Sequence, residues 1–248
     1  MQNEIILFET ADKEIKLTVS VKNNTVWLNR NQLAKLFGRD VKTIGKHINN
    51  ALKEELEEKL GTELLYAAAA IPPGVSEGSV KSIGYVLEGA GFEVTNIVDE
   101  PTAAAAVLKI TDGAVVDVGG GTTGISILKD GKVIYTDDEA TGGSHMTMTV
   151  AGHYRIPYEE AEVLKTTPEK EKEIFPVIKA TVEKMASITE KFLKGYEIPA
   201  VYVVGGSASF QEFTSVFEKK LNLPVYRPVH PLLVTPLEIG RASCRERV

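Results

Sequence analysis

The chain of 248 residues contains one cysteine, Cys244, which excludes an internal disulfide framework and a cysteine-based zinc site. Its four histidines are scattered along the sequence, so a histidine metal site is not expected either. No apolar run reaches the roughly 18 residues that a membrane-spanning helix needs. The N-terminal stretch MQNEIILFET lacks the basic segment and apolar core of a secretory signal. These absences favour a cytoplasmic protein without a membrane partner.

The charge is uneven along the chain. Residues 1–52 carry eight Lys and Arg against five Asp and Glu, a net charge of +3; because the whole chain carries −6, the remainder carries −9. A basic head on an acidic body predicts two parts with different partners. The acidic body itself is a poor partner for nucleic acid, because both carry negative charge.

The head predicts a small α+β module. Alternating apolar residues predict short strands in EIILFE, EIKLTVSV and TVWL, which span residues 4–28. Two helices with helix-turn-helix spacing are expected next, broken at Gly38 and restarted at the N-cap Asp40. The exposed side chains of the second helix can reach phosphates and base edges, so residues 30–50 are a candidate DNA-binding segment. A plain helical hairpin with a solvated face explains the same pattern.

Residues 3–52 resemble the N-terminus of the virulence-protein RhuM family. Val26-Trp27-Leu28, Gln32-Leu33-Ala34 and Phe37 carry the resemblance, which implies a DNA-associated module. The last eleven residues, EIGRASCRERV at 238–248, resemble the translation of a sequencing adapter and have no helical or strand periodicity. We therefore expect an artefactual tail, a natural sequence that continues differently after Leu237, and a hybrid join within residues 51–60.

The body from residue 53 predicts an α/β fold. A charged helix is followed by strand, helix, strand and helix up to residue 110, an order typical of a parallel sheet with crossover helices. Asp130-Gly131 between apolar alternations predicts a tight hairpin. Further helices are expected around 146–164 and 174–193. A strand at 200–204, a helix at 211–221 and a last strand at 224–229 complete the pattern.

A glycine loop follows the strand that ends near Val118. Gly119, Gly121 and Gly124 satisfy G-x-G-x-x-G, but a strand follows them instead of the helix that a dinucleotide fold requires. A Walker A loop is excluded, because no G-K-[ST] is present. What remains is a phosphate clamp inside a β-hairpin, or a turn that binds nothing. Three consecutive glycines are costly for a mere turn and favour the clamp.

The clamp hypothesis assigns a role to each residue around the loop. Backbone N–H groups of the glycines would approach phosphate oxygens, two threonines would add hydroxyl donors, and Asp117 would hold Mg²⁺ through water. A carboxylate at Glu100 could orient a hydrolytic water, or it could simply be a charge favoured at a helix N-terminus. The predicted clamp residues are Gly119, Gly120, Gly121, Thr122 and Thr123.

A second glycine loop, Gly205-Gly206-Ser207, lies between a strand and a helix. Ligands bind at such positions in α/β folds, although simple turn chemistry is the alternative. Asp117-x-Gly-Gly-Gly-Thr, Glu100-Pro-Thr-Ala-Ala-Ala and Val-Gly-Gly-Ser together resemble the nucleotide site of the actin and DnaK-type superfamily. Within it, residues 53–237 resemble the EutJ family of ethanolamine-utilisation proteins through AAAAIPPG, VDEPTAAA, VVDVGGGTTGISIL, ATGGSHM and YVVGGSA.

The resemblance implies an actin-like ATPase fold whose two lobes close on MgATP. Carried over to this sequence, Asp117 and residues 119–122 become the second phosphate motif, Glu100 lies near the hydrolytic water, and Gly205-Gly206-Ser207 contact adenosine. Four further residues are expected in the cleft: Glu162 and Lys165 near the ribose or base, with Gly142 and Gly143 along its wall.

One family motif is missing. No Asp-x-Gly-Thr precedes the first helix of the body, and Gly61-Thr62 has Lys59 where the aspartate belongs. We therefore expect a truncated first lobe at 53–112, a nearly complete second lobe at 113–237, and weak or absent hydrolysis. The implied role is an ATP-binding chaperone or reactivation factor in ethanolamine utilisation, associated with a client enzyme or a bacterial microcompartment. A DNA-binding regulator and a filament-forming protein are the alternatives.

Overall fold

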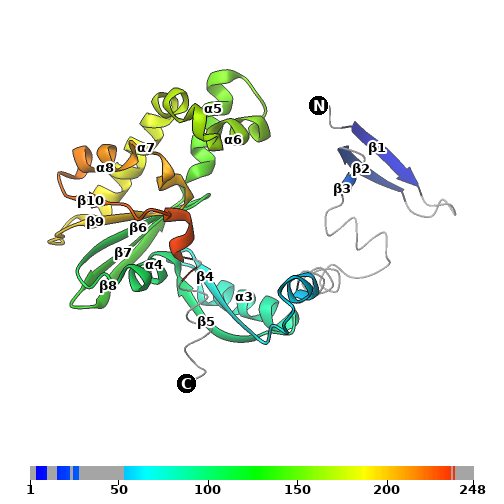
Figure 1. Ribbon diagram of the computed structural model, residues 1–248, viewed down its shortest axis with the longest axis horizontal. Coiled ribbons are helices and arrows are strands. Elements are labelled where there is room, and N and C mark those ends of the chain that lie inside the picture. Colours follow the sequence, from blue (N-terminus) through cyan, green and yellow to red (C-terminus); the bar gives the residue numbers. More distant parts are fainter. Residues whose placement is uncertain (1–3, 10–15, 23–24, 28–52, 236, 238–248) are drawn as a thin grey trace. The chain divides into compact units, whose positions relative to one another are not determined.

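The computed structural model describes residues 4–9, 16–22, 25–27, 53–235 and 237 (Figure 1). The candidate DNA-binding segment at 30–50 and the tail at 238–248 lie outside the described residues. The chain divides into two compact units, Met1–Ala67 with Lys81–Val94, and Ala68–Val80 with Thr95–Val248. Of the helices in the described part, none is both long enough and apolar enough to span a bilayer.

The first unit contains the three strands expected near the N-terminus, which form an antiparallel sheet in the order β1-β2-β3. A helix over residues 53–60 ends at Gly61, whose φ of +63° is the left-handed conformation that glycine adopts at helix ends. Gly61-Thr62 is therefore a helix end and not a phosphate-binding hairpin. The strands are β1 (Glu4–Glu9), β2 (Lys16–Lys22) and β3 (Thr25–Trp27).

The segment 66–108 alternates strands and helices, as the sequence predicts. β4 and β5 form a two-stranded sheet, and each is followed by a helix. None of the residues of α3 is fully buried, whereas α4 buries Pro101, Ala103, Ala104 and Ala105. The elements are β4 (Tyr66–Ile71), α3 (Glu77–Gly89), β5 (Glu93–Asp99) and α4 (Glu100–Leu108).

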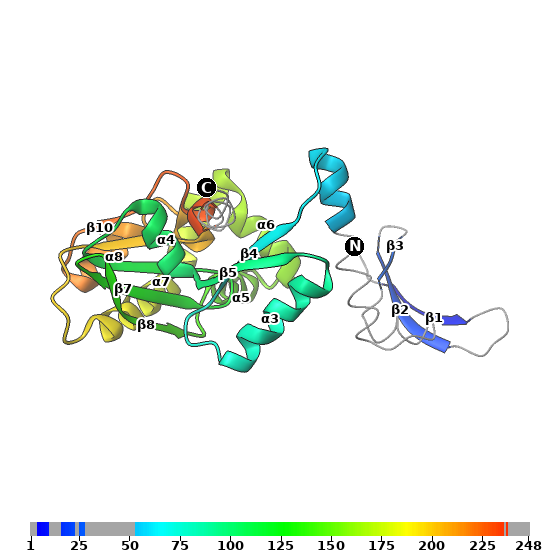
Figure 2. The ribbon, with the colours of Figure 1, turned by 90° about the horizontal axis from the view of Figure 1, so that it is seen from below.

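A five-stranded mixed sheet in the order β10-β9-β6-β7-β8 is the centre of the second unit. β6, β7 and β8 are antiparallel neighbours, and β9 and β10 run parallel to β6. Figure 2 shows β7 and β8 side by side as a hairpin, closed by Asp130 and Gly131 with φ of 52° and 72°. The strands are β6 (Gly113–Val118), β7 (Thr123–Lys129), β8 (Lys132–Glu139), β9 (Val201–Val204) and β10 (Val225–Tyr226).

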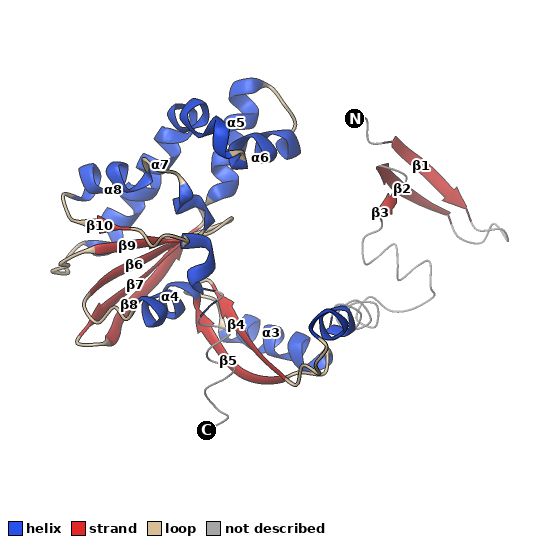
Figure 3. Ribbon diagram, viewed as in Figure 1, coloured by secondary structure: helices blue, strands red, loops and turns tan. Residues whose placement is uncertain are grey.

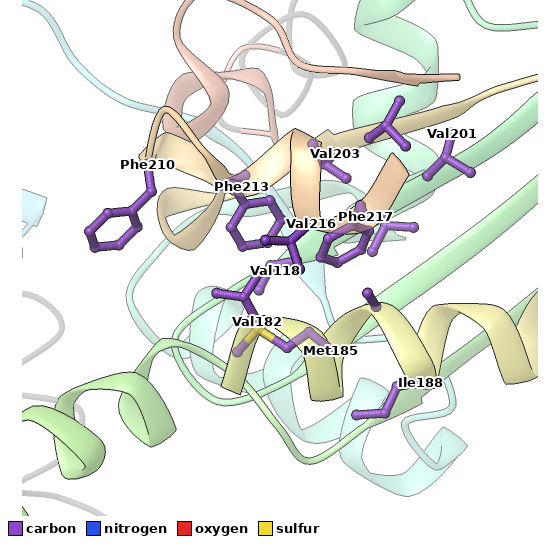
Figure 4. Close-up of a cluster of buried hydrophobic side chains, with 14 of the residues drawn as sticks. Val118, Val182, Met185, Ile188, Val201, Val203, Phe210, Phe213, Val216 and Phe217 are labelled. Carbon is purple, nitrogen blue, oxygen red and sulfur yellow. The ribbon is translucent and has the colours of Figure 1, made fainter. Parts of the chain in front are cut away.

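Helices cover both faces of this sheet (Figures 1 and 3). Successive β6 residues point to opposite faces: Val116 and Val118 join the core under α7 and α8, and Val115 packs with α4. Phe213 and Phe217 of α8 stack at 4.8 Å in the larger core (Figure 4). The helices are α5 (Gly143–Tyr154), α6 (Tyr158–Thr166), α7 (Glu171–Leu193) and α8 (Phe213–Leu221).

The helical stretch expected around 146–164 consists of two helices, α5 and α6. Arg155 adopts a left-handed φ of 56° at the end of α5, and Pro157 precedes α6. Proline cannot donate a backbone hydrogen bond, so the chain turns here. The turn brings α6 beside α5, and this pairing forms one side of the cleft described below.

Candidate functional site

A cleft of about 910 Å³ lies in the second unit where β6 and β9 end. These strands are parallel, so the glycine loops that follow them meet at the same edge of the sheet. The cleft brings together ten of the residues predicted from the sequence. They are Glu100, Asp117, Gly119, Gly120, Gly143, Glu162, Lys165, Gly205, Gly206 and Ser207.

The first glycine loop is held by backbone hydrogen bonds. The Gly119 amide donates to the Thr122 carbonyl at 3.1 Å, which closes the β6–β7 turn. The Gly119 carbonyl accepts from the Gly143 amide at 2.9 Å, and the Gly120 carbonyl accepts from the Ser144 amide at 2.8 Å. The loop is therefore fixed to the first turn of α5. Among the described residues, the amides of Gly120 and Gly121 have no acceptor and remain free to donate.

Gly142 has a packing role beside this loop. A Cβ at Gly142 would lie 2.7 Å from both the Gly121 carbonyl carbon and the Thr122 amide nitrogen. Those atoms belong to the backbone and cannot rotate away, so only glycine fits there. Gly121, Thr122 and Gly142 do not line the cleft itself.

Thr123 was expected to offer a hydroxyl to phosphate, and the structure uses it differently. Its side chain is fully buried, and its hydroxyl donates to the Thr141 carbonyl at 2.6 Å. The hydroxyl is thus already bonded to a carbonyl in the segment that follows β8. Thr123 does not reach the cleft.

The second loop packs directly against Asp117. Gly205 has a φ of +89°, and a Cβ there would lie 2.5 Å from Asp117 Oδ1. Glycine is required for both reasons. The Ser207 hydroxyl donates to the Gly119 carbonyl at 3.3 Å, so the two glycine loops are joined.

Glu100 and Asp117 line the cleft and have no cationic partner among the described residues. Burial raises the pKa of Glu100, and the negative charges of Asp117, Asp138 and Asp99 raise it further. Burial also raises the pKa of Asp117, opposed by a hydrogen bond from the Thr235 hydroxyl to Oδ2 at 2.9 Å. This site therefore favours the binding of a cation, either directly or through the cation's water ligands.

Glu100 owes its place to the start of α4. The Asp99 carboxylate caps the helix by accepting from the Thr102 amide at 3.0 Å, and Pro101 occupies the first turn. The Thr102 hydroxyl is paired with that of Ser126 on β7 at 2.8 Å. These contacts fix the first turn of α4 on the sheet and hold Glu100 at the cleft.

Glu162 and Lys165 form an ion pair on the α6 wall. Lys165 Nζ lies 2.8 Å from Glu162 Oε2 and donates to the Thr147 hydroxyl at 2.8 Å and to the Gly143 carbonyl at 3.2 Å. Burial raises the pKa of Glu162, but hydrogen bonds from Lys165 and Thr147 outweigh this effect and lower it overall. The Lys165 side chain is only 10% exposed, so its cation is held in the cleft wall.

Several cleft residues were not predicted from the sequence. Thr235 and Leu232 reach the cleft from the segment after β10, where η3 (Pro231–Leu233) returns to the second glycine loop. Ser209 and Phe210 directly follow that loop in the sequence, and this position alone could have predicted that they line the cleft. Five more residues come from α6, from the turn η1 (Pro168–Lys170) that follows it and from the start of α7, namely Tyr158, Thr166, Thr167, Pro168 and Glu171.

No group of three His, Cys, Asp or Glu side chains that could hold a metal ion is present among the described residues. A divalent cation here would need oxygen ligands from water and from a bound phosphate. Asp117 fits such a role, since its Oδ1 atom receives no hydrogen bond within the described part of the chain. A buried carboxylate oxygen without a donor is suited to a metal-bound water.

Sequence comparisons identify relatives of this chain. The sequence model of the FtsA family, described as cell division protein FtsA, matches residues 114–238. The ethanolamine utilization protein EutJ of Salmonella typhimurium strain LT2 is 44% identical over 191 residues, which are 77% of this chain and 67% of that protein.

Solved structures show the same fold. The crystal structure of EutJ from Carboxydothermus hydrogenoformans matches with a TM-score of 0.72 and 40% identity, over 90% of this chain and 84% of that one. The matched share of this chain is larger than the share made up by residues 53–237, for which the sequence resemblance was stated. MreB 5 of Spiroplasma citri, solved bound to AMPPNP, matches in fold with a TM-score of 0.67 and 18% identity, over 79% of this chain and 74% of that one. The chain belongs to the family of the ethanolamine utilization protein EutJ and has the actin-like ATPase fold.

Proposed function

We propose that the cleft binds ATP as its magnesium complex, with the phosphates at the first glycine loop. The observation that carries the proposal is the unbonded amide of Gly120, a residue that lines the cleft together with the buried Asp117 carboxylate; the amide of the adjacent Gly121 is unbonded as well among the described residues. Free backbone donors bind phosphate oxygens, and a nearby carboxylate binds the accompanying cation. The fold supports the proposal, because MreB 5 of Spiroplasma citri binds AMPPNP.

Each cleft residue then has a role in binding. Gly120 and Gly121 donate to phosphate oxygens, and the Lys165 ammonium, fixed by Thr147, offers its charge from the α6 wall. Ser207 and the loop around it contact the nucleoside. Phe210, which is 9% exposed at the far end, supplies an apolar surface for the base.

Asp117 would hold the magnesium ion through water, and Glu100 would orient a water molecule toward the phosphates. Mg²⁺, when bound, neutralises phosphate charge and supplies a fixed geometry for the β- and γ-oxygens. The raised pKa of each carboxyl group fits a site whose negative charges are compensated only when the cation arrives. Asp117→Asn is therefore expected to lose affinity for MgATP more than for ATP in EDTA.

A thermal-shift experiment tests nucleotide binding. A ligand present at a hundred times its Kd stabilises the folded protein by about 2.7 kcal/mol. For a domain of this size, that corresponds to a rise in Tm of roughly 5–11 °C. MgATP should raise the Tm of the parent more than that of Asp117→Asn, and no shift of the parent at millimolar MgATP would contradict the proposal.

We expect ATP to be hydrolysed very slowly. Phosphoryl transfer depends on positive groups and metal contacts placed on both sides of the phosphates. The sequence has no Asp-x-Gly-Thr, and Gly61-Thr62 ends a helix. The motif that would hold the phosphates from the side opposite Asp117 is therefore missing from the sequence. Phosphate release by this chain should be far below that of the Salmonella EutJ protein if that relative hydrolyses ATP. Equal rates would overturn this expectation.

We further propose that the protein acts in ethanolamine utilisation as a chaperone or reactivation factor, in the cytoplasm or at a bacterial microcompartment. Family membership supports the pathway, and 27% identity to the chaperone HscA homolog of Ralstonia pickettii over 77% of this chain supports the class of activity. The test is recovery of activity by an inactivated enzyme of ethanolamine catabolism when the protein and MgATP are added. Recovery that is the same with Asp117→Asn would contradict a nucleotide-driven role.

A further inference from the structure

Arg227, just after β10, contacts the backbone of the second glycine loop. Its Nη1 donates to the carbonyls of Ala208, Ser209 and Phe210 at 2.9, 2.7 and 2.5 Å. One nitrogen of the guanidinium thus serves three consecutive carbonyls. Within the described part of the chain, Arg227 forms no ion pair with a carboxylate.

The three carbonyls lie where η2 (Gly206–Ser209) ends. The last carbonyls of a helical turn have no partner inside it, and a cation is the favoured group there. The next helix, α8, takes up only the Phe210 carbonyl, through the Phe213 amide at 3.2 Å. Arg227 therefore satisfies the end of a turn that the local sequence leaves open.

The same turn carries cleft residues on its other side. Gly205, Gly206, Ser207, Ser209 and Phe210 all line the cleft, and Arg227 does not. Phe210 packs on Phe175 with ring centroids 5.9 Å apart, at the edge of the aromatic cluster in Figure 4.

At its other end, this loop is already held. The Gly205 amide donates to the Pro231 carbonyl at 3.0 Å, and the Ser207 hydroxyl bonds the Gly119 carbonyl. The carbonyls of Ala208 and Ser209 accept from no other group among the described residues, so they are the part that depends on Arg227. Loss of the guanidinium would free this half of the loop to move Ser209 and Phe210 relative to the fixed phosphate end.

We propose that Arg227 is a positioning residue that sets nucleotide affinity by holding the Gly205–Phe210 loop in its binding conformation, without touching the nucleotide. The inference rests on the proposed function of this cleft. Nη1 carries two hydrogens, so at least one of its N–H groups is shared between two carbonyls, and charge-assisted hydrogen bonds of this kind are strong enough for their loss to matter. We expect Arg227→Ala to weaken MgADP binding about ten-fold, in line with the worth of hydrogen bonds to charged groups.

The test compares the full chain and three variants by calorimetric titration with MgADP. Arg227→Ala should bind about ten-fold more weakly. Arg227→Lys should fall between it and the parent, since an ammonium also donates to carbonyls. Lys220→Ala, which removes an exposed cation paired with Glu190 at 2.9 Å, is the matched control and should bind like the parent.

Hydrogen–deuterium exchange separates positioning from general stability. In Arg227→Ala, amides of residues 206–210 should exchange faster, while those of β6 and α5 should keep their protection. Exchange raised throughout the second unit would make Arg227 a general stability residue and overturn the inference. Unchanged MgADP affinity, or a lysine variant no better than alanine, would also overturn it while leaving the proposed function intact. If the parent chain binds no nucleotide, both the inference on Arg227 and the proposed function are contradicted.

Discussion

Replacing Gly142 by alanine tests how tightly the first glycine loop is packed. Gly142 has extended backbone, with φ −146° and ψ −163°, so alanine is conformationally allowed and only the new methyl group matters. Its Cβ would lie 2.7 Å from backbone atoms of Gly121 and Thr122 and 2.8 Å from the Gly119 carbonyl oxygen. Ordinary contacts begin at 3.4 Å, so the loop and α5 must separate by about 0.7 Å (3.4 − 2.7).

Overpacking of this kind costs about 1–3 kcal/mol. For a protein of this size each kcal/mol lowers Tm by about 2–4 °C. The shift also moves the amides of Gly120 and Gly121, so MgATP affinity should fall at least about ten-fold, as expected when hydrogen bonds to a charged group are lost. Thermal unfolding by circular dichroism and titration with MgATP measure the two effects.

Gly152→Ala is the matched control, because it lies in the same helix with no atom within 4 Å of its added Cβ. Alanine at a helical glycine stabilises by about 0.5–1 kcal/mol. The control should therefore raise Tm slightly and leave MgATP affinity unchanged. If Gly142→Ala is as stable as the control and binds MgATP as well as the parent, the packing argument is wrong.

Two further predictions follow from charges in the cleft. Burial raises the pKa of Asp117 above its ordinary 3.8, so the folded protein holds this proton more tightly than the unfolded chain, and stability falls as pH rises through the raised pKa. Asp117→Asn should therefore have a higher Tm than the parent at pH 7 without ligand, and this advantage should vanish below about pH 4; a lower Tm at pH 7 would contradict it. Lys165→Met removes the ammonium bonded to Thr147 and Gly143 and should weaken MgATP binding about ten-fold. Glu162→Gln, which keeps a hydrogen-bond acceptor for Thr147, should weaken MgATP binding less. If titration shows that Glu162→Gln weakens MgATP binding more than Lys165→Met, the role given to the Lys165 charge is wrong.

The elements of the second unit were predictable because each has a local signal. Apolar runs mark β6 and β9, Asp130-Gly131 marks the hairpin, and residues 119–121 mark the loop between β6 and β7. The break between α5 and α6 follows from Pro157, a signal that the helical periodicity on either side obscures.

The site was predictable only where its residues form motifs. The two glycine loops and Asp117 meet in the cleft as expected, because parallel strands end at one edge. Thr235 and Glu171 reach the cleft through packing of distant segments, which no spacing encodes. The hydroxyl of Thr123 is bound to Thr141, a neighbour known only from the β7–β8 pairing.

Several expectations are not tested by the structure. The RhuM resemblance of residues 3–52, the candidate DNA contacts of residues 30–50 and the tail at 238–248 stay predictions. So do the boundaries 1–52, 53–112 and 113–237. Long reads of single DNA molecules across codons 45–65 and 230–248 would test the join and the tail together.

Calorimetric titration of MgATP into the parent chain and Asp117→Asn decides whether the cleft is a nucleotide site. We expect one site per chain in the parent, a Kd weakened at least about ten-fold in Asp117→Asn, and a smaller difference when Mg²⁺ is removed by EDTA. Equal binding of MgATP by both proteins, or no binding by the parent, would contradict a nucleotide site built on Asp117 and the two glycine loops.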